Sequence, residues 1–182
     1  MLGHSIVFNA HEVKEKINVS PQETAVARNL SVKENLELIA RIYGGDKKTA
    51  QLKTKEMLTF SLTEVANDKA KTLSGGMQRR LSIAMALISN PQILFLDEPT
   101  LGLDVIARRE LWSTIEKLKG KITIILTTHY MEEAGALSDR IAVMAKGQLK
   151  AVGTAKELIS STNAETLENA FIALATESEV NI

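Results

Sequence analysis

Hydrophobic and polar residues alternate with helical periodicity in three segments of the first half of the chain. In the first segment, Ser31 and Glu34 have the spacing of a capping box. The apolar positions that follow recur every three or four residues until Gly44-Gly45 ends the pattern. A second helix is predicted from Asp46 to near Leu58, and a third from Ser74 to Ser89. One apolar face of the third helix is predicted to consist of Leu81, Ala84, Met85 and Ile88.

Continuous apolar runs in the second half predict parallel strands that are covered on both faces. Ile93–Leu96 and Ile122–Leu126 are such runs, and a helix is predicted near Val105–Lys119 between them. This order of strand, helix and strand indicates the α/β fold class. The remaining predicted elements are two short edge strands at Ser5–Phe8 and Ile17–Val19, a hairpin of Ile141–Ala145 and Gln148–Val152 around Lys146-Gly147 at the sheet's edge, and helices from Thr154 and near Ala164–Ala175.

Composition narrows the classes of function. The 182 residues are 45% hydrophobic, which is enough for a buried core. Lys plus Arg and Asp plus Glu number 22 each, and this balance argues against a nucleic-acid partner. The absence of Cys excludes disulfides, thiolate zinc sites and Cys nucleophiles, and it fits a cytosolic protein. No apolar run approaches a membrane span and the first residues lack a signal-peptide pattern, so we expect membrane association only through a partner.

Two neighbouring segments have the residues that bind nucleotide phosphates and Mg²⁺. Ser74, Gly75 and Gly76 place a hydroxyl and free amides at a predicted helix N-terminus, which attracts an anion. Asp97 and Glu98 end a predicted buried strand, where open α/β sheets bind their ligands. Side chains of adjacent strand residues point to opposite faces, so one of the two carboxylates can face a metal ion. The other can reach an attacking water only if the strand has already ended at that residue. Taken singly, these features are also common as an ordinary helix cap and a solvated strand end.

Four motifs in order make the chain resemble the nucleotide-binding domain of ATP-binding-cassette (ABC) transporters from about Ser5 to Leu174. LeuSerGlyGlyMetGln at 73–78 resembles the signature motif, and IleLeuPheLeuAspGlu at 93–98 the Walker B strand. LeuGlyLeuAsp at 101–104 is similar to the D-loop, and ThrThrHisTyr at 127–130 to the switch region. Pro21-Gln22 resembles the Q-loop. The residues at 128–134 and 167–174 are most similar to cassettes that serve exporters with a separate permease.

The resemblance implies a role for each matching residue. Asp97 would hold Mg²⁺, Glu98 would be the general base, and His129 would donate to the γ-phosphate of ATP. Gln22 would sense Mg²⁺ and transmit closure to a permease. In the alternative interpretation, His129 is structural and Gln22 is a polar loop residue.

The signature and the D-loop would act between two subunits. The resemblance implies that Ser74, Gly75, Gly76 and Gln78 contact the γ-phosphate bound to the opposite subunit. Asp104 would orient the dimer interface, and an Asp before Val105 would also cap the helix that follows, so both roles can coexist.

One motif of the family is missing. A Walker A phosphate loop, GlyxxxxGlyLys followed by Ser or Thr, would stand about a hundred residues before the signature. The sequence contains a single Gly-Lys pair that is a candidate, Gly120-Lys121, but Ile115 and Ile122 occupy the positions of the first glycine and of the hydroxyl residue. We therefore expect a cassette without its N-terminal part, which would be inactive alone.

The resemblance also divides the chain and implies its partners. The expected fold is a truncated, P-loop NTPase-like parallel sheet core with a three-helix signature subdomain, a C-terminal hairpin and further helices. Residues 1–26 would be a remnant of the N-terminal core strands with the Q-loop, 27–90 the helical signature subdomain, 91–160 the Walker B, D-loop and switch core, and 161–182 the C-terminal helix and tail.

The expected function is that of an ATP-binding subunit that lies at the cytoplasmic face of the membrane as a peripheral protein. It would use ATP and Mg²⁺ in a head-to-tail dimer with a second cassette. The dimer would drive export through a membrane permease. The main alternative is a non-catalytic interaction module that docks on a permease or a full-length cassette. A DNA-repair or translation ATPase fits less well, because the chain has no long coiled coil, second cassette or basic surface.

Overall fold

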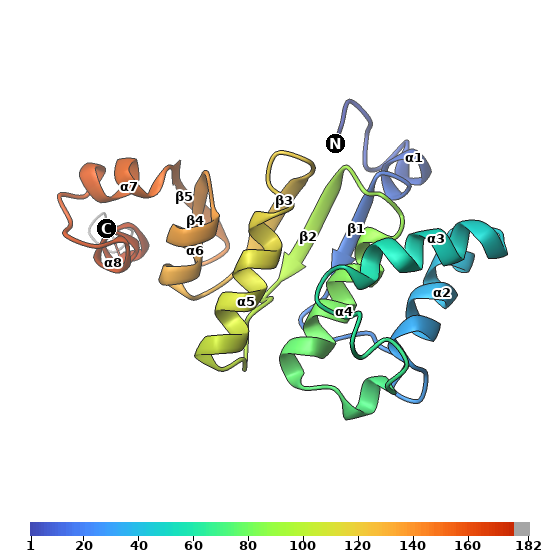
Figure 1. Cartoon of the computed structure of the whole chain (residues 1–182). Helices are drawn as coiled ribbons and strands as arrows, with labels where there is room; N and C mark the ends of the chain where they lie inside the picture. Colours follow the sequence, from blue (N-terminus) through green and yellow to red (C-terminus); the bar gives the residue numbers. More distant parts are fainter. Residues whose placement is uncertain (177–182) are drawn as a thin grey trace. The chain divides into compact units, whose positions relative to one another are not determined.

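The computed structural model describes residues 1–176 and divides into two compact units, one from Met1 to Thr127 and one from Thr128 onward. The first unit holds a three-stranded parallel sheet and the helices around it (Figure 1). The second holds a two-stranded antiparallel sheet and three helices. The α/β class with a parallel core is therefore confirmed. Among the described residues, none of the helices combines the length and apolar character that a membrane crossing requires.

The parallel sheet has the strand order β1-β2-β3, where β1 is Ile17–Ser20, β2 is Ile93–Asp97 and β3 is Thr123–Thr127. Ser20 pairs with Leu96, and Asp97 pairs with Thr127. On one face of the central strand, Leu94 and Leu96 are 0% and 1% exposed. The predicted coverage of both faces is wrong for β3, because Ile125 is 40% exposed on the opposite face.

The three predicted helices of the first half all form. α2 is Val32–Ile42 and begins with the predicted capping box, in which the Ser31 side chain accepts from the Glu34 amide and the Glu34 side chain accepts from the Ser31 amide. α3 is Lys47–Leu58, capped by Asp46, and α4 is Gly75–Leu87. α2 packs on both α3 and α4 (Figure 1).

The burial of α4 differs from the prediction of one apolar face. Leu81, Ala84 and Ile88 are fully buried, but Met85 is only partly covered, and Arg79, Arg80 and Ser82 are buried as well. The physical reason is that α4 contacts α2, α3, α5, β1 and β2, so it is enclosed on most sides rather than on one. Its polar side chains must therefore find partners inside the unit.

The first residues of the chain do not form the strand predicted at Ser5–Phe8. The Ser5 hydroxyl accepts hydrogen bonds from the amides of Val7 and Phe8, and this local turn competes with extended backbone. Three short elements of the described residues were not predicted from the sequence: the helix α1, Ala10–Lys14, the 3₁₀ helix η1, Ala70–Thr72, and the helix α6, Met131–Leu137. The predicted helix after Asp104 is α5, Val105–Glu116.

The second unit contains α6 (Met131–Leu137), β4 (Ile141–Ala145), β5 (Gln148–Gly153), α7 (Ala155–Ser161) and α8 (Leu167–Thr176). The predicted hairpin turn is confirmed at Lys146 and Gly147, which both have positive φ, at 51° and 74°. The hairpin forms its own two-stranded sheet, so its predicted place at the edge of the parallel sheet is wrong. The buried hydrophobic residues of this unit include Val143 on β4, Leu158 on α7 and Ala170 on α8.

Candidate functional site

The carboxyl ends of the three parallel strands meet at one edge of the sheet in the first unit. Pro21-Gln22 follows β1 directly, Asp97 ends β2 and Glu98 follows it, and Thr127 ends β3. Since Ser20 pairs with Leu96, Gln22 and Glu98 both lie two residues beyond a paired position. Open α/β sheets bind their ligands at this kind of edge.

The side chain of Asp97 is held by a neighbour on β3. The Thr127 hydroxyl donates to Asp97 Oδ1 at 2.5 Å, and Asp97 is exposed. A carboxylate fixed through one oxygen is oriented to offer the other to a cation. Within residues 1–176, acidic and His side chains form no group of three that would hold a metal ion by themselves. Mg²⁺ is commonly bound by one or two protein carboxylates together with phosphates and water, so a single carboxylate at this edge is compatible with that ion.

Glu98 has an unusual backbone conformation. Its φ is +44°, in the left-handed region that residues other than Gly rarely adopt. Its amide donates to the carbonyl oxygen of Thr127 at 3.1 Å and to Oγ1 of Thr127 at 3.3 Å. Its carbonyl oxygen accepts from the amide of Leu101 at 3.2 Å. The strand thus ends at Asp97, and Glu98 leaves the alternation of the strand.

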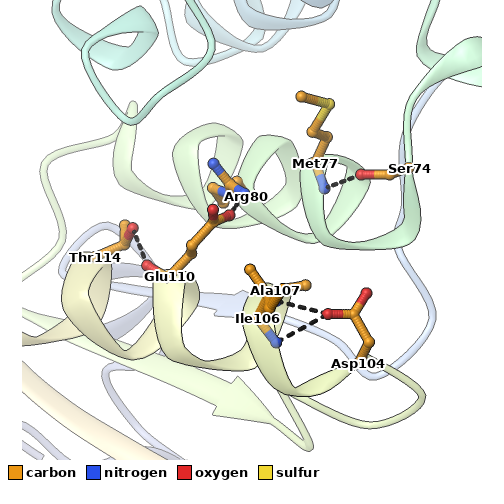
Figure 2. A network of polar contacts seen from close by, with 8 residues as sticks. All are labelled: Ser74, Met77, Arg80, Asp104, Ile106, Ala107, Glu110 and Thr114. Carbon is orange, nitrogen blue, oxygen red and sulfur yellow. Dashed lines mark hydrogen bonds and ion pairs between the residues drawn. The ribbon is translucent and has the colours of Figure 1, made fainter.

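The signature segment forms the N-terminus of α4. Ser74 is the N-cap, and its hydroxyl oxygen accepts from the Met77 amide at 3.2 Å (Figure 2). The Gln78 side chain donates from Nε2 to the carbonyl oxygen of Leu73 at 3.1 Å. Ser74 and Gly75 are exposed, so the first turn of α4 is accessible to an anion.

The D-loop segment packs against the same end of α4. Asp104 Oδ1 accepts from the amides of Ile106 and Ala107, each at 2.9 Å, and caps α5 as predicted (Figure 2). A Cβ atom added to Gly76 would lie 3.0 Å from Cβ of Ala107, so only a glycine lets the two helices approach this closely. The structure therefore brings the signature and the D-loop together.

Two residues of this region were not identified from the sequence. Thr127 orients Asp97, and the buried side chain of Arg79 donates to the main chain of the Q-loop segment, at Pro21 and Gln22, and of Glu98. For Thr127 the available signal was a hydroxyl residue at the end of an apolar run. For Arg79 it was a charged residue inside a helix that is otherwise largely apolar.

His129 belongs to the second unit. Its ring lies 4.2 Å, centroid to centroid, from the ring of Tyr130, and the residue is exposed just before α6 begins at Met131. The first unit thus brings together the predicted residues Gln22, Asp97 and Glu98 at one sheet edge, and Ser74 to Gln78 with Asp104 at the end of α4. His129 is placed in the other unit, next to an aromatic ring.

Comparisons with known proteins identify the family. A family model described as "ABC transporter" matches residues 2–101. The daunorubicin resistance ATP-binding protein DrrA3 of Streptomyces coeruleorubidus is 39% identical over 91% of this chain, and the linearmycin resistance ATP-binding protein LnrL of Bacillus subtilis (strain 168) is 38% identical over 91%. The match covers 53% of DrrA3 and 54% of LnrL, so the chain spans about half the length of these relatives.

A solved structure supports the fold. The chain described as "Structure of ATP binding subunit of ABC transporter" superimposes with a TM-score of 0.79 and 24% sequence identity, covering 96% of this chain and 74% of that one. The superposition supports the fold, and the family model covers more than half of the chain. The chain belongs to the ABC transporter family.

Proposed function

We propose that this chain supplies the hydrolytic and signature parts of an ABC transporter ATP-binding subunit, which hydrolyses ATP in a head-to-tail dimer and drives export through a membrane permease. The observation that carries this proposal is the edge of the sheet where Thr127 holds both the carboxylate of Asp97 and the amide of Glu98. Such a pair places a metal ligand and a base one residue apart on a fixed backbone.

Asp97 is the proposed metal ligand, together with Gln22, which follows β1 at the same edge of the sheet. When bound, Mg²⁺ would neutralise charge on the phosphates of ATP. The contribution of this chain is to fix Asp97 through the Thr127 hydroxyl, so that the carboxylate need not reorganise when the ion arrives.

Glu98 is the proposed general base that accepts a proton from the attacking water. Because its peptide lies past the end of β2, its carboxylate does not follow the alternation of the strand. His129 is proposed to donate to the γ-phosphate and to stabilise the charge that develops there.

The signature and D-loop are proposed to act on the opposite subunit. Ser74 and Gly75, which are exposed at the first turn of α4, would approach a γ-phosphate held by the partner, together with Gly76 and Gln78 of the same segment. Asp104 would orient that interface through the capped start of α5. The dipole of one helix contributes only about 0.3–1 kcal/mol, so this contact cannot hold ATP without a phosphate loop.

No segment of the 182 residues has the pattern of a phosphate loop, so we infer that the isolated chain does not hydrolyse ATP. The names of DrrA3 and LnrL, both resistance ATP-binding proteins, support a role in export. We place the protein at the cytoplasmic face of the membrane, bound through a permease. The competing proposal is a non-catalytic docking module. The lack of a phosphate-loop pattern in the sequence also supports it, because a docking module would not need to bind ATP.

Association with a full-length cassette separates the two proposals. The chain is mixed with a cassette trapped with bound ATP, and complex formation is followed by light scattering with and without nucleotide. The ATPase proposal expects weak association that requires ATP and is abolished by Ser74→Arg, because the larger side chain would occupy the γ-phosphate position. Equal association without ATP, or in the Ser74→Arg variant, would favour the docking module.

A further inference from the structure

Arg79 joins the signature helix to two loops of the candidate site. Its side chain is buried, with the residue 4% exposed, in the second turn of α4. Nη1 donates to the carbonyl oxygen of Pro21 at 2.5 Å, and Nη2 donates to that of Gln22 at 2.5 Å and to that of Glu98 at 3.3 Å. One guanidinium therefore contacts the main chain that follows β1 and the main chain that follows β2.

The chemistry of arginine suits this arrangement. The guanidinium stays charged at every physiological pH and presents its N–H groups in a rigid planar fork, so two nitrogens reach two successive carbonyl groups without a change of rotamer. A buried charge is costly unless it is fully hydrogen-bonded. The carbonyl oxygens of Pro21 and Gln22 provide that compensation only while the Q-loop segment keeps its present backbone conformation.

The contact with Glu98 falls on a strained residue. A positive φ at a residue other than Gly persists only when the surrounding structure enforces it. Thr127 binds the amide of Glu98, and Arg79 binds its carbonyl oxygen, so the peptide groups on both sides of Glu98 are fixed by other segments. Arg79 is the member of this pair that comes from the signature helix.

We propose that Arg79 is a positioning residue that fixes the backbones of Gln22 and Glu98 to α4, so that engagement of the signature sets the geometry of the metal-sensing and base residues in the same subunit. This inference rests on the proposed function for the role of Glu98 as the base. The contacts themselves do not depend on it.

The next residue of the helix is a matched control. Arg80 is also buried, at 8% exposed, but its Nη2 is paired with Oε2 of Glu110 on α5 at 2.5 Å (Figure 2). Substitutions at Arg79 and Arg80 thus remove the same group from adjacent positions of one helix. The two guanidinium groups differ in their partners, which are the Q-loop and Glu98 for Arg79 and α5 for Arg80.

Amide hydrogen exchange of the 182-residue chain tests the contacts directly. Met fills the space of an arginine stem without its charge, so Arg79→Met is expected to fold, and Arg79→Lys is a second variant that keeps the charge but lacks the fork. We expect Arg79→Met to speed exchange at least about tenfold at the amides of Glu98 and Leu101 relative to those of α2, with a smaller effect for Arg79→Lys. Arg80→Met is expected to leave that ratio unchanged.

Two outcomes would overturn the proposal. One is a uniform change of exchange across α2 and the Glu98 segment, which would mean that Arg79 contributes only to overall stability. The other is an equal local effect of Arg80→Met. If Arg79→Met does not fold, Arg79→Lys takes its place in the same comparison.

Turnover provides the second measurement, in the chain joined to a segment that carries a phosphate loop. Because a displacement of about 1 Å can cost about a hundredfold in rate, Arg79→Met should lower kcat roughly 10- to 100-fold with little change in the KM for ATP. A change in exchange without a change in kcat would reject positioning. If the unsubstituted protein does not hydrolyse ATP, the proposed function fails, and the exchange measurement still decides whether Arg79 fixes the two backbones.

Discussion

At the scale of single residues, the site depends on Thr127 as much as on the two carboxylates. Its hydroxyl donates to Asp97, while its carbonyl oxygen and Oγ1 accept from the amide of Glu98. One side chain on β3 therefore orients the proposed metal ligand and restrains the proposed base. Such supporting hydrogen bonds commonly change metal affinity or activity by about 10- to 100-fold when they are removed.

Thr127→Val should weaken the response to Mg²⁺, because valine has nearly the shape of threonine but cannot donate to Asp97. We expect the Mg²⁺ concentration for half-maximal ATP hydrolysis to rise about tenfold or more in a chain joined to a phosphate-loop segment. Thr123→Val, at the other end of β3, is the control and should behave like the unsubstituted protein. An equal response of both variants would remove Thr127 from the metal site.

At the scale of elements, the close approach of α4 and α5 depends on Gly76. The prediction from sequence treated Gly75 and Gly76 alike, as free amides for an anion. The structure distinguishes them, because a Cβ atom added to Gly76 would lie 3.0 Å from Cβ of Ala107, whereas one added to Gly75 would make only an ordinary contact, 3.7 Å from the side chain of Leu103.

Gly76→Ala should destabilise the protein, since the new methyl group would meet Ala107 and force the helices apart. Overpacking of this kind costs about 1–3 kcal/mol, which exceeds the gain of roughly 1 kcal/mol from replacing a glycine in a helix. Gly75→Ala should be neutral or slightly stabilising. Urea unfolding of the two variants measures the difference, and a lower midpoint for Gly75→Ala than for Gly76→Ala would contradict this account.

The capping box of α2 gives a prediction on pH. Hydrogen bonds from the Ser31 amide and then from its hydroxyl lower the pKa of Glu34 below its ordinary value of 4.5. A lowered pKa in the folded state means that the stabilisation is fully present above pH 4.5 and is lost as the pH falls through the folded-state pKa. Glu34→Gln should therefore lower the thermal midpoint at pH 7 but have a smaller effect near pH 3.

The measurement for this prediction is thermal unfolding of Glu34→Gln at the two pH values, with Glu56→Gln on the exposed surface of α3 as the control. A constant difference between Glu34→Gln and the unsubstituted chain at both pH values would show that the charge of Glu34 does not contribute to the cap.

The sequence was sufficient for elements whose signal is local. The capping box at Ser31 and the turn at Lys146-Gly147 depend on residues a few positions apart, and both were predicted. The burial of α4 was not, because it depends on the several elements that surround the helix. Likewise, the contact of Arg79 with Gln22 and Glu98 joins residues that are 57 and 19 positions apart, and no periodicity in the chain reports it.

At the scale of the whole molecule, the proposed catalytic residues belong to both units of the chain. Asp97, Glu98 and the signature lie in the first unit, and His129 lies in the second. The fold agrees with that of an ABC ATP-binding subunit, and the sequence has no phosphate loop of its own. The central claim is therefore that Glu98 acts on ATP whose phosphates are held by residues other than these 182.

Single-turnover hydrolysis by Glu98→Gln tests this claim most directly, in the chain joined to an N-terminal segment that carries a phosphate loop. The amide keeps the size of the side chain but cannot accept the proton of the attacking water, and Asp97 remains available to Mg²⁺. We predict that ATP binding is retained, that hydrolysis falls about a hundredfold or more, and that an ATP-bound dimer accumulates. Near-normal turnover in Glu98→Gln would contradict the account.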